Sequence, residues 1–163
     1  MEENRANSED SVNLGNLGSL GNLGNAFRYR RRVQFAETDL AGIVHFSCLF
    51  RYMEEAEHAL WRAAGLSVAG PAGDLGWPRV GAAFEFRSPL RFEEEFEVLV
   101  RLAEVKRRSL HYEHTIVRGD TVIGTGTMSV VCVRKGAGTA MQAAKIPEAI
   151  VKQLQAVLSN DSG

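Results

Sequence analysis

The stretch Val33-Gln34-Phe35-Ala36-Glu37-Thr38-Asp39-Leu40-Ala41-Gly42-Ile43-Val44-His45-Phe46 joins a segment patterned as a strand to a segment patterned as a helix. Upstream, residues 27–35 alternate between apolar and arginine side chains, which predicts a half-buried strand. Downstream, apolar residues spaced three or four apart over 49–63 predict a long amphipathic helix. Ser47 is the predicted N-cap of this helix, and Gly65 is the residue predicted to follow its end.

The sequence after the helix changes its period. Residues 66–78 are rich in glycine and proline, which predicts a loop. Beyond this loop the apolar residues alternate with a period of two, which predicts strands. The predicted strands cover residues 84–92, 96–102, 109–117 and 121–133. The turn Arg118-Gly119-Asp120 joins the last two as a hairpin, and Pro147 opens a short C-terminal helix.

This order of elements predicts an α+β domain. Strands joined by hairpins form an antiparallel sheet, and one amphipathic helix can cover a face of such a sheet. We expect the domain to span residues 27–158 and a short tail to follow over 159–163. Residues 1–26 include a Leu-Gly-Asn repeat with too little side-chain area to offset the entropy lost on ordering, which predicts a flexible low-complexity tail.

Charge and composition narrow the functional classes. Over 163 residues, 19 Lys and Arg against 20 Asp and Glu give a net charge of −1, which argues against nucleic-acid binding. The sequence has neither an apolar run long enough for a transmembrane helix nor a secretory signal pattern. Cys48 and Cys132 have neither metal-ligand nor disulfide-framework spacing, which fits reduced thiols. We therefore expect a cytoplasmic protein without a membrane partner.

The candidate chemistry lies in the loop Glu37–Phe46, where Asp39 precedes the start of a helix. The free N–H groups of a helix N-terminus bind negative charge. A carboxylate nucleophile or base beside such a helix end is an arrangement suited to acyl transfer. Gly42 would permit a turn that a side chain would block. The residues alone also allow Asp39 to be an ordinary turn or cap residue.

The segment Val33–Phe46, with the following Phe50-Arg51-Tyr52-Met53-Glu54-Glu55-Ala56, resembles the 4-hydroxybenzoyl-CoA thioesterase family of hot-dog-fold proteins. The shared pattern is a strand, an acidic or polar residue, Thr-Asp, two residues, Gly, a short apolar run and a helix with aromatic and Glu positions. The later stretch Phe86-Arg87-Ser88-Pro89-Leu90-Arg91-Phe92 is similar to the family's second strand. The resemblance extends over residues 27–135.

The resemblance implies a hot dog fold, in which a five-stranded antiparallel sheet wraps a long central helix. It implies self-association into a dimer or a dimer of dimers (a homotetramer), with sites between subunits. The implied reaction is hydrolysis of an acyl-CoA thioester, with Asp39 as nucleophile or as general base on water. The Phe46 backbone amide would polarise the thioester carbonyl, and Gly42 and His45 would shape the loop.

One departure from the family concerns histidine. Some relatives carry a catalytic His at the position of Phe46, whereas here the histidine is His45. A shift of one residue at a helix start turns the side chain by about 100°. We therefore assign His45 no acid–base role and place it among the substrate-binding residues.

Further polar residues are candidates for substrate contact. Glu54 matches a family glutamate on the helix that is either structural or lines the pocket, and it is placed among the substrate-binding residues. The sequence Lys106-Arg107-Arg108 is either a solvated hairpin or a clamp for the phosphates of CoA. Glu55, Glu57 and the arginines at positions 28, 30, 31 and 32 are expected on solvated faces.

Other chemistries find no support in the pattern. The Glu-x-x-His spacing that ends at His58 occurs in di-iron bundles, but those need more helices than this chain offers, so no metal site is expected. No nucleophile elbow, phosphate loop or dinucleotide fingerprint is present. Gly124-Thr125-Gly126 lies in a strand pattern and favours a bulge or close packing over ligand binding. No cofactor is expected, because coenzyme A is part of the substrate.

Three functions remain open at the level of sequence. The first is an acyl-CoA thioesterase acting on an aromatic or a short-to-medium aliphatic acyl group, and fused aromatic groups are included because similar sequences occur among naphthoyl-CoA hydrolases. The second is a non-catalytic acyl-CoA-binding hot-dog protein. The third is a hydratase or dehydratase, for which the paired His and carboxylate are not seen. Free CoA thioesters and carrier-protein thioesters are not distinguished.

Overall fold

The computed structural model describes residues 25–69, 74–135 and 140–160, so almost all of the predicted N-terminal tail lies outside the described residues. The elements in chain order are β1 (Phe27–Arg32), the 3-10 helix η2 (Phe35–Glu37), α1 (Phe46–Ala63), β2 (Leu75–Gly76), β3 (Arg79–Phe86), β4 (Glu95–Val105), β5 (Ser109–Arg118), β6 (Thr121–Val131), β7 (Val133–Lys135), β8 (Met141–Ala143) and α2 (Glu148–Asn160).

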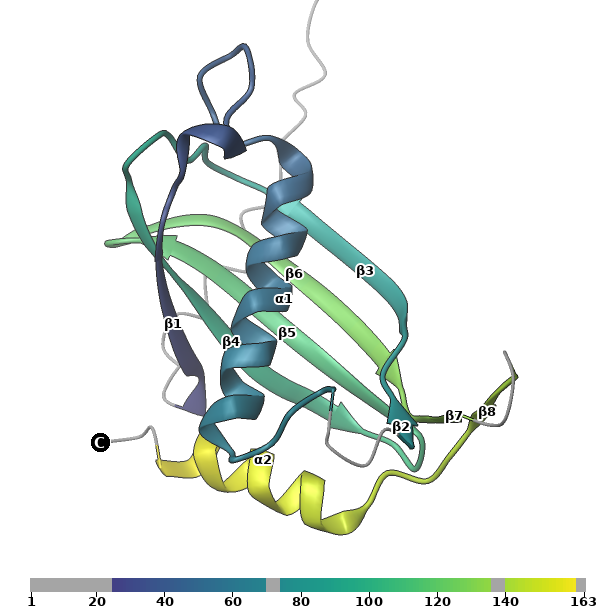
Figure 1. Ribbon diagram of the computed structural model, residues 1–163. Coiled ribbons are helices and arrows are strands. Elements are labelled where there is room, and N and C mark those ends of the chain that lie inside the picture. Colours follow the sequence, from purple (N-terminus) through teal and green to yellow (C-terminus); the bar gives the residue numbers. More distant parts are fainter. Residues whose placement is uncertain (1–24, 70–73, 136–139, 161–163) are drawn as a thin grey trace, which may run out of the picture.

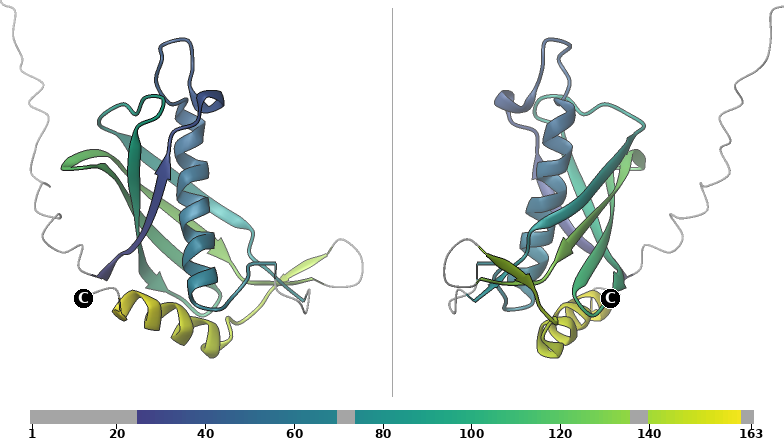
Figure 2. Two further views of the ribbon diagram at one scale, coloured as in Figure 1. Left: turned by 60° about the vertical axis from the view of Figure 1, so that its left-hand side comes forward. Right: turned by 90° about the vertical axis from the view of Figure 1, so that its right-hand side faces the viewer.

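A five-stranded antiparallel sheet forms the main layer, in the order β1-β4-β5-β6-β3. The helix α1 lies across one face of this sheet, and α2 packs at the end of the sheet where α1 ends (Figure 1). Figure 2 shows the strands crossing behind α1 at an angle. The predicted α+β class and the five-stranded antiparallel sheet are confirmed. A second sheet, β2-β7-β8, was not predicted, because its strands are only two or three residues long and show no period.

The hydrophobic core lies between α1 and the sheet. Alternate residues of β4, namely Phe96, Val98 and Val100, are buried, and from α1 Tyr52 and Leu60 are fully buried against them. A period of two on the strand and a spacing of three or four on the helix therefore produce complementary apolar surfaces. The patterns that predicted these two elements are confirmed.

The strand β1 is shorter than predicted and ends at Arg32. The chain then turns through η2, where the Glu37 carboxylate accepts the Gln34 N–H at 2.8 Å and closes a capping box. Val33 is still buried, but the turn points Phe35 outward and leaves it 75% exposed. A local side-chain hydrogen bond thus ends the alternation earlier than the apolar pattern indicates.

The strand β3 starts before its predicted range and ends at Phe86 rather than at residue 92. The next two amides, those of Arg87 and Ser88, both donate to the Ile123 carbonyl, at 2.9 and 3.1 Å, which breaks the ladder. Pro89 follows and has no N–H with which to resume it.

The helix α1 begins one residue before its predicted N-cap. Ser47 lies inside the helix, and the N-cap is His45, whose Nδ1 accepts the Ser47 N–H at 3.3 Å. The cap moves upstream because the His45 N–H is bonded to the Glu37 carbonyl at 2.8 Å, which fixes an extended residue at that point. At the other end Gly65 has φ +71°, which confirms its predicted place after the helix.

The two glycines of β6 are packing residues, as predicted. A Cβ at Gly126 would collide with the Met53 sulfur and the Phe84 ring, and a Cβ at Gly124 would collide with Phe84 and the Glu85 carbonyl. These positions have to be glycine so that α1 and β3 can approach β6 closely.

Candidate active site

The chain between η2 and α1 forms a closed loop over residues 38–44, here called the Asp39 loop, which projects beyond the end of the sheet (Figure 1). The loop is held by the Asp39 N–H, which donates to the Ile43 carbonyl at 2.9 Å, and by a bridge between Thr38 and Val44. Gly42 turns the chain with φ +73° and donates its N–H to the Asp39 carbonyl at 2.9 Å. The backbone conformation expected of Gly42 is therefore present.

The Asp39 carboxylate is exposed at this loop. Its Oδ1 accepts the Ala41 N–H at 2.8 Å. Within the described ranges its Oδ2 has no hydrogen-bond partner. One oxygen is thus fixed by the turn, and the other is left available for chemistry.

The start of α1 supplies a second free group. Phe46 is the first residue of the helix, and its backbone N–H makes no hydrogen bond within the part of the chain that the structure describes. Such an amide carries the partial positive charge of the helix N-terminus. Phe46 is 61% exposed, and its ring lies against the His45 ring, with 4.6 Å between their centroids. This amide can therefore stabilise a developing oxyanion.

His45 serves the helix start directly. Its Nδ1 lies 2.8 Å from Ser47 Oγ, in addition to accepting the Ser47 N–H. One ring nitrogen is therefore committed to the cap, in keeping with an expected role in shaping the loop.

Side chains next to this loop form a hydrogen-bond network that the sequence analysis did not predict. Arg31, Glu37 and Tyr52, here called the Glu37 clamp, join β1, η2 and α1 through side-chain hydrogen bonds. The expectation that Arg31 is solvated is wrong, because only 18% of its side chain is exposed. Its parity with Phe27 and Tyr29 was an available signal, since residues two apart on a strand share a face.

The clamp keeps Glu37 ionised. Burial pushes the pKa of the Glu37 carboxyl upward, but hydrogen bonds from Arg31, the Gln34 N–H and Tyr52 outweigh burial and hold this pKa below its ordinary value. Burial, together with the hydrogen bond to Glu37, raises the pKa of the Tyr52 hydroxyl. Tyr52 is therefore the donor and Glu37 the acceptor of their bond.

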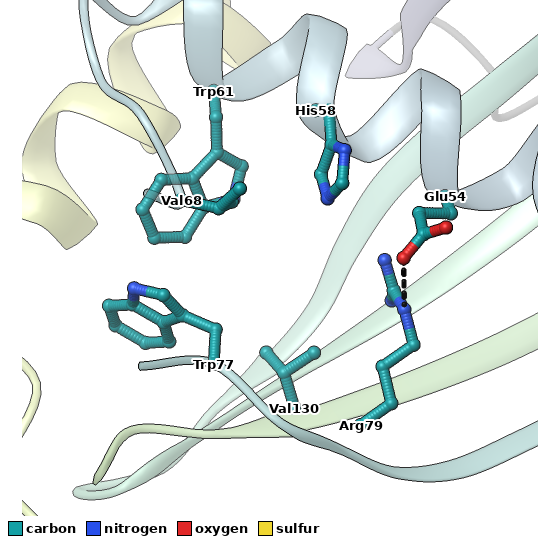
Figure 3. A pocket seen from close by; sticks show the side chains of 7 residues that line it. All are labelled: Glu54, His58, Trp61, Val68, Trp77, Arg79 and Val130. Carbon is teal, nitrogen blue, oxygen red and sulfur yellow. Dashed lines mark hydrogen bonds and ion pairs between the residues drawn. The ribbon is translucent and has the colours of Figure 1, made fainter. Parts of the chain in front are cut away.

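Glu54 lines a cavity of about 280 Å³ between α1 and the start of β3 (Figure 3). The remaining lining residues are His58, Trp61, Val68, Trp77, Arg79 and Val130. The two indoles meet edge to face, with 4.9 Å between ring centroids. Arg79 Nε lies 3.2 Å from Glu54 Oε1, so the cavity combines aromatic walls with a charged end.

Behind this cavity lies a buried ionic group. Arg79 Nη1 bonds Glu57 Oε2 at 2.7 Å, and His114 Nε2 lies 3.2 Å from Glu57 Oε1. Burial lowers the pKa of Arg79, but the Glu57 and Glu54 carboxylates outweigh burial and raise this pKa above its ordinary value. The expectation of a solvated Glu57 is wrong, because only 3% of this residue is exposed. Glu57 lies four residues after Met53, and residues four apart share a helix face, so this spacing could have predicted that Glu57 faces the core.

The basic cluster lies at the other end of the sheet from Asp39. Lys106, Arg107 and Arg108 form the exposed β4–β5 hairpin, beside the pair Val105↔Leu110. The Asp39 loop follows Arg32, which pairs with Glu95 at the opposite end of β4. Within one subunit the structure therefore does not bring this cluster to Asp39.

Some properties concern the described residues as a whole. Both Cys48 and Cys132 are buried free thiols. Within the described ranges, no three His, Cys, Asp or Glu side chains gather as a potential metal site. In the same residues, no helix combines the length and the apolar character needed to span a bilayer.

Comparison with known proteins gives consistent matches. The family model described as the thioesterase-like superfamily matches residues 33–154. A protein from Aquifex aeolicus that carries the name of an esterase is 36% identical over 112 residues, which is 68% of this chain and 87% of that protein. A 1,4-dihydroxy-2-naphthoyl-CoA hydrolase from Synechococcus elongatus is 22% identical over 132 residues, which is 79% of this chain and 95% of that hydrolase.

Similarity extends to solved structures. The structure of a gentisyl-coenzyme A thioesterase matches with a TM-score of 0.69 and 27% identity, over 76% of this chain and 98% of that one. The antiparallel sheet with its helices, together with this overall similarity and the family match, confirms the expected hot dog fold.

Proposed function

The chain belongs to the thioesterase-like superfamily and by that membership is a thioester hydrolase, and from this premise we propose that it hydrolyses an acyl-CoA to a free acid and CoA. The observation that carries the proposal is that one short segment between η2 and α1 holds an exposed Asp39 carboxylate and ends at the free Phe46 N–H. The motif Thr38-Asp39-x-x-Gly42 further supports a place within the 4-hydroxybenzoyl-CoA thioesterase branch. A cytoplasmic location stays a prediction from sequence.

In the proposed reaction the thioester carbonyl oxygen accepts a hydrogen bond from Phe46 N–H. As a nucleophile, the Asp39 carboxylate attacks the carbonyl carbon, CoA leaves as a thiolate, and water then hydrolyses the mixed anhydride. As a general base, Asp39 instead takes a proton from the water that attacks the same carbon. In both versions the Phe46 amide stabilises the oxyanion, and losing one such donor typically costs about 3 kcal/mol. Neither version requires a cofactor.

The edges of the sheet favour a site shared between two subunits. On the β1 edge, Arg28, Arg30 and Arg32 pair with glutamates of β4, which protects that edge by charge. The β3 edge instead exposes Val80 and the small residues Gly81, Ala82 and Ala83. We propose that two copies pair through β3, as a dimer that can form a dimer of dimers.

Antiparallel β3 pairing would combine opposite ends of the two subunits. In each subunit β3 runs from Arg79, beside the cavity, to Phe86, at the end that carries the Asp39 loop (Figure 1). A two-fold axis through β3 therefore brings the Asp39 loop of one copy toward the cavity end of the other. Glu54 would then contact the acyl group, and Lys106-Arg107-Arg108 would lie at the right end for CoA phosphates.

The cavity favours an aromatic acyl group over an aliphatic one. Trp61 and Trp77 offer flat apolar walls, and Glu54 offers a carboxylate that can accept a hydrogen bond. The relatives named for naphthoyl-CoA and gentisyl-CoA substrates support the same choice. Short-to-medium aliphatic groups and carrier-protein thioesters are the alternatives for a substrate panel.

Thiol release from a panel of aromatic and aliphatic acyl-CoAs tests the proposal. We expect turnover by the parent protein and a loss of kcat on the order of 100-fold or more in Asp39→Asn, since that is what a catalytic carboxylate typically contributes. Asp120→Asn is the matched control, because Asp120 is an exposed carboxylate in the β5–β6 turn, at the same end of the sheet.

Two results would contradict the proposal. An Asp39→Asn variant as fast as the parent excludes the Asp39 mechanism. Binding of acyl-CoAs by the parent without thiol release from any of them would favour the non-catalytic acyl-CoA-binding protein.

A further inference from the structure

Glu37 accepts hydrogen bonds from three separate parts of the chain. Its Oε2 accepts Arg31 Nη1 at 2.8 Å, Tyr52 Oη at 2.8 Å and the Gln34 N–H at 2.8 Å. Its Oε1 accepts Arg31 Nη2. Only 13% of the Glu37 side chain is exposed, so these bonds are largely shielded from water.

The partners of Glu37 are themselves immobilised. Arg31 Nε bonds Glu55 Oε2 at 2.6 Å, and the guanidinium lies 4.4 Å from the centre of the Tyr52 ring. Tyr52 is fully buried in the core between α1 and the sheet. The carboxylate is therefore fixed by rigid elements on both sides.

The backbone of Glu37 connects this clamp to the reacting groups. Its carbonyl accepts the His45 N–H at 2.8 Å, and two residues later Asp39 N–H bonds Ile43 at 2.9 Å. Asp39 thus stands on one arm of a short ladder that ends at the Glu37–His45 bond, and Phe46 directly follows the other arm at that end. The position of the Asp39 carboxylate relative to the Phe46 amide depends on how firmly Glu37 is held.

We infer that Glu37 is a positioning residue for thioester hydrolysis, which acts by fixing Asp39 against the Phe46 amide without touching substrate. This inference rests on the proposed function. A displacement of about 1 Å between reacting groups can lower a rate 100-fold, so loosening the clamp is expected to reduce kcat. Because Glu37 makes no substrate contact in this role, KM should change little.

The test is the pair Glu37→Gln and Glu94→Gln. Glu94 makes a comparable set of bonds, because its Oε2 accepts the Arg91 N–H at 2.8 Å and Arg118 Nη1 at 2.7 Å, yet its side chain does not bond the Asp39 loop. We expect kcat to fall about 10-fold or more in Glu37→Gln, with KM within about twofold, and to stay within about twofold in Glu94→Gln. Tyr52→Phe removes only the hydroxyl from the clamp and should show a smaller loss of kcat.

Amide hydrogen exchange provides a readout that does not depend on turnover. Exchange of the amides in residues 38–44 should accelerate in Glu37→Gln and in Tyr52→Phe but not in Glu94→Gln. In the Asp39→Asn background, Glu37→Gln should lower the residual rate by less than it lowers the parent rate, since part of its effect acts through Asp39.

These experiments distinguish a failure of the positioning role of Glu37 from a failure of the proposed thioesterase function. If the parent is active and Glu37→Gln has the same kcat as the parent, the inference is overturned while the proposed function stands. The same holds if residues 38–44 exchange at the same rates in both proteins. Equal losses in Glu37→Gln and Glu94→Gln reduce Glu37 to a general structural role and also overturn it. A parent that releases no thiol overturns the proposed function and the inference together.

Discussion

At the scale of single residues, the clamp makes one carboxylate important for both geometry and pH response. The hydrogen bonds that hold the pKa of Glu37 below its ordinary value of 4.5 mean that its ionised form stabilises the folded state. Stabilisation of this kind is fully present above pH 4.5 and is lost as the pH falls through the folded-state pKa.

This linkage predicts the acid stability of Glu37→Gln. The glutamine has no proton to take up, so the stability difference between parent and variant should be largest above about pH 5 and should narrow below about pH 4. Denaturant unfolding of both proteins at a series of pH values measures this difference in the free energy of unfolding. Glu94 and Glu95, whose pKa values hydrogen bonds from arginines also lower, keep some acid sensitivity in both proteins. Curves that stay parallel down to pH 3 would contradict the expectation.

At the scale of elements, periodicity predicted the two helices and the five strands of the main sheet, and local hydrogen bonds decided where several of them begin or end. The alternation of β4 and the stripe of α1 were readable because each repeats over ten or more residues. The end of β1 and the cap of α1 both depend on Glu37, which bonds Gln34 through its side chain and His45 through its carbonyl. No pattern of apolar residues reports such bonds.

The cap of α1 leads to a prediction about stability. His45→Ala removes the acceptor for the Ser47 N–H and should lower the free energy of unfolding by about 1 kcal/mol. His45→Asn supplies another short acceptor and should restore most of that loss. Urea denaturation of the three proteins measures the difference. Equal stability of His45→Ala and the parent would show that the cap contributes nothing.

At the scale of the whole molecule, the sequence pointed to those members of the candidate site that are close along the chain. Asp39, Gly42 and Phe46 lie within eight residues, so one motif reveals them together. The contacts of Glu57 with Arg79 and His114 join three distant segments, which no single stretch displays. Lys106-Arg107-Arg108 ended far from Asp39 because β4, eleven residues at about 3.3 Å each, leads the chain to the opposite end of the sheet.

The β3 edge carries the prediction about assembly. The double variant Val80→Lys/Ala82→Lys places like charges on both copies across a two-fold axis and should convert the proposed dimer to a monomer. It should also abolish most thiol release, because the proposed site needs both copies. Light scattering after size-exclusion chromatography measures the mass. Val105→Lys, a partly exposed apolar residue on β4, is the control. A dimer that survives the double variant would exclude pairing through β3.

The cavity of Figure 3 has a practical consequence for studying this protein. Trp61 and Trp77 are the only two tryptophans in the chain, and both line that cavity. When the protein is excited at a wavelength that only indole absorbs, all of its fluorescence therefore comes from this cavity. The intrinsic fluorescence of the unlabelled protein is a reporter for whatever enters there, with no background from the remainder of the polypeptide.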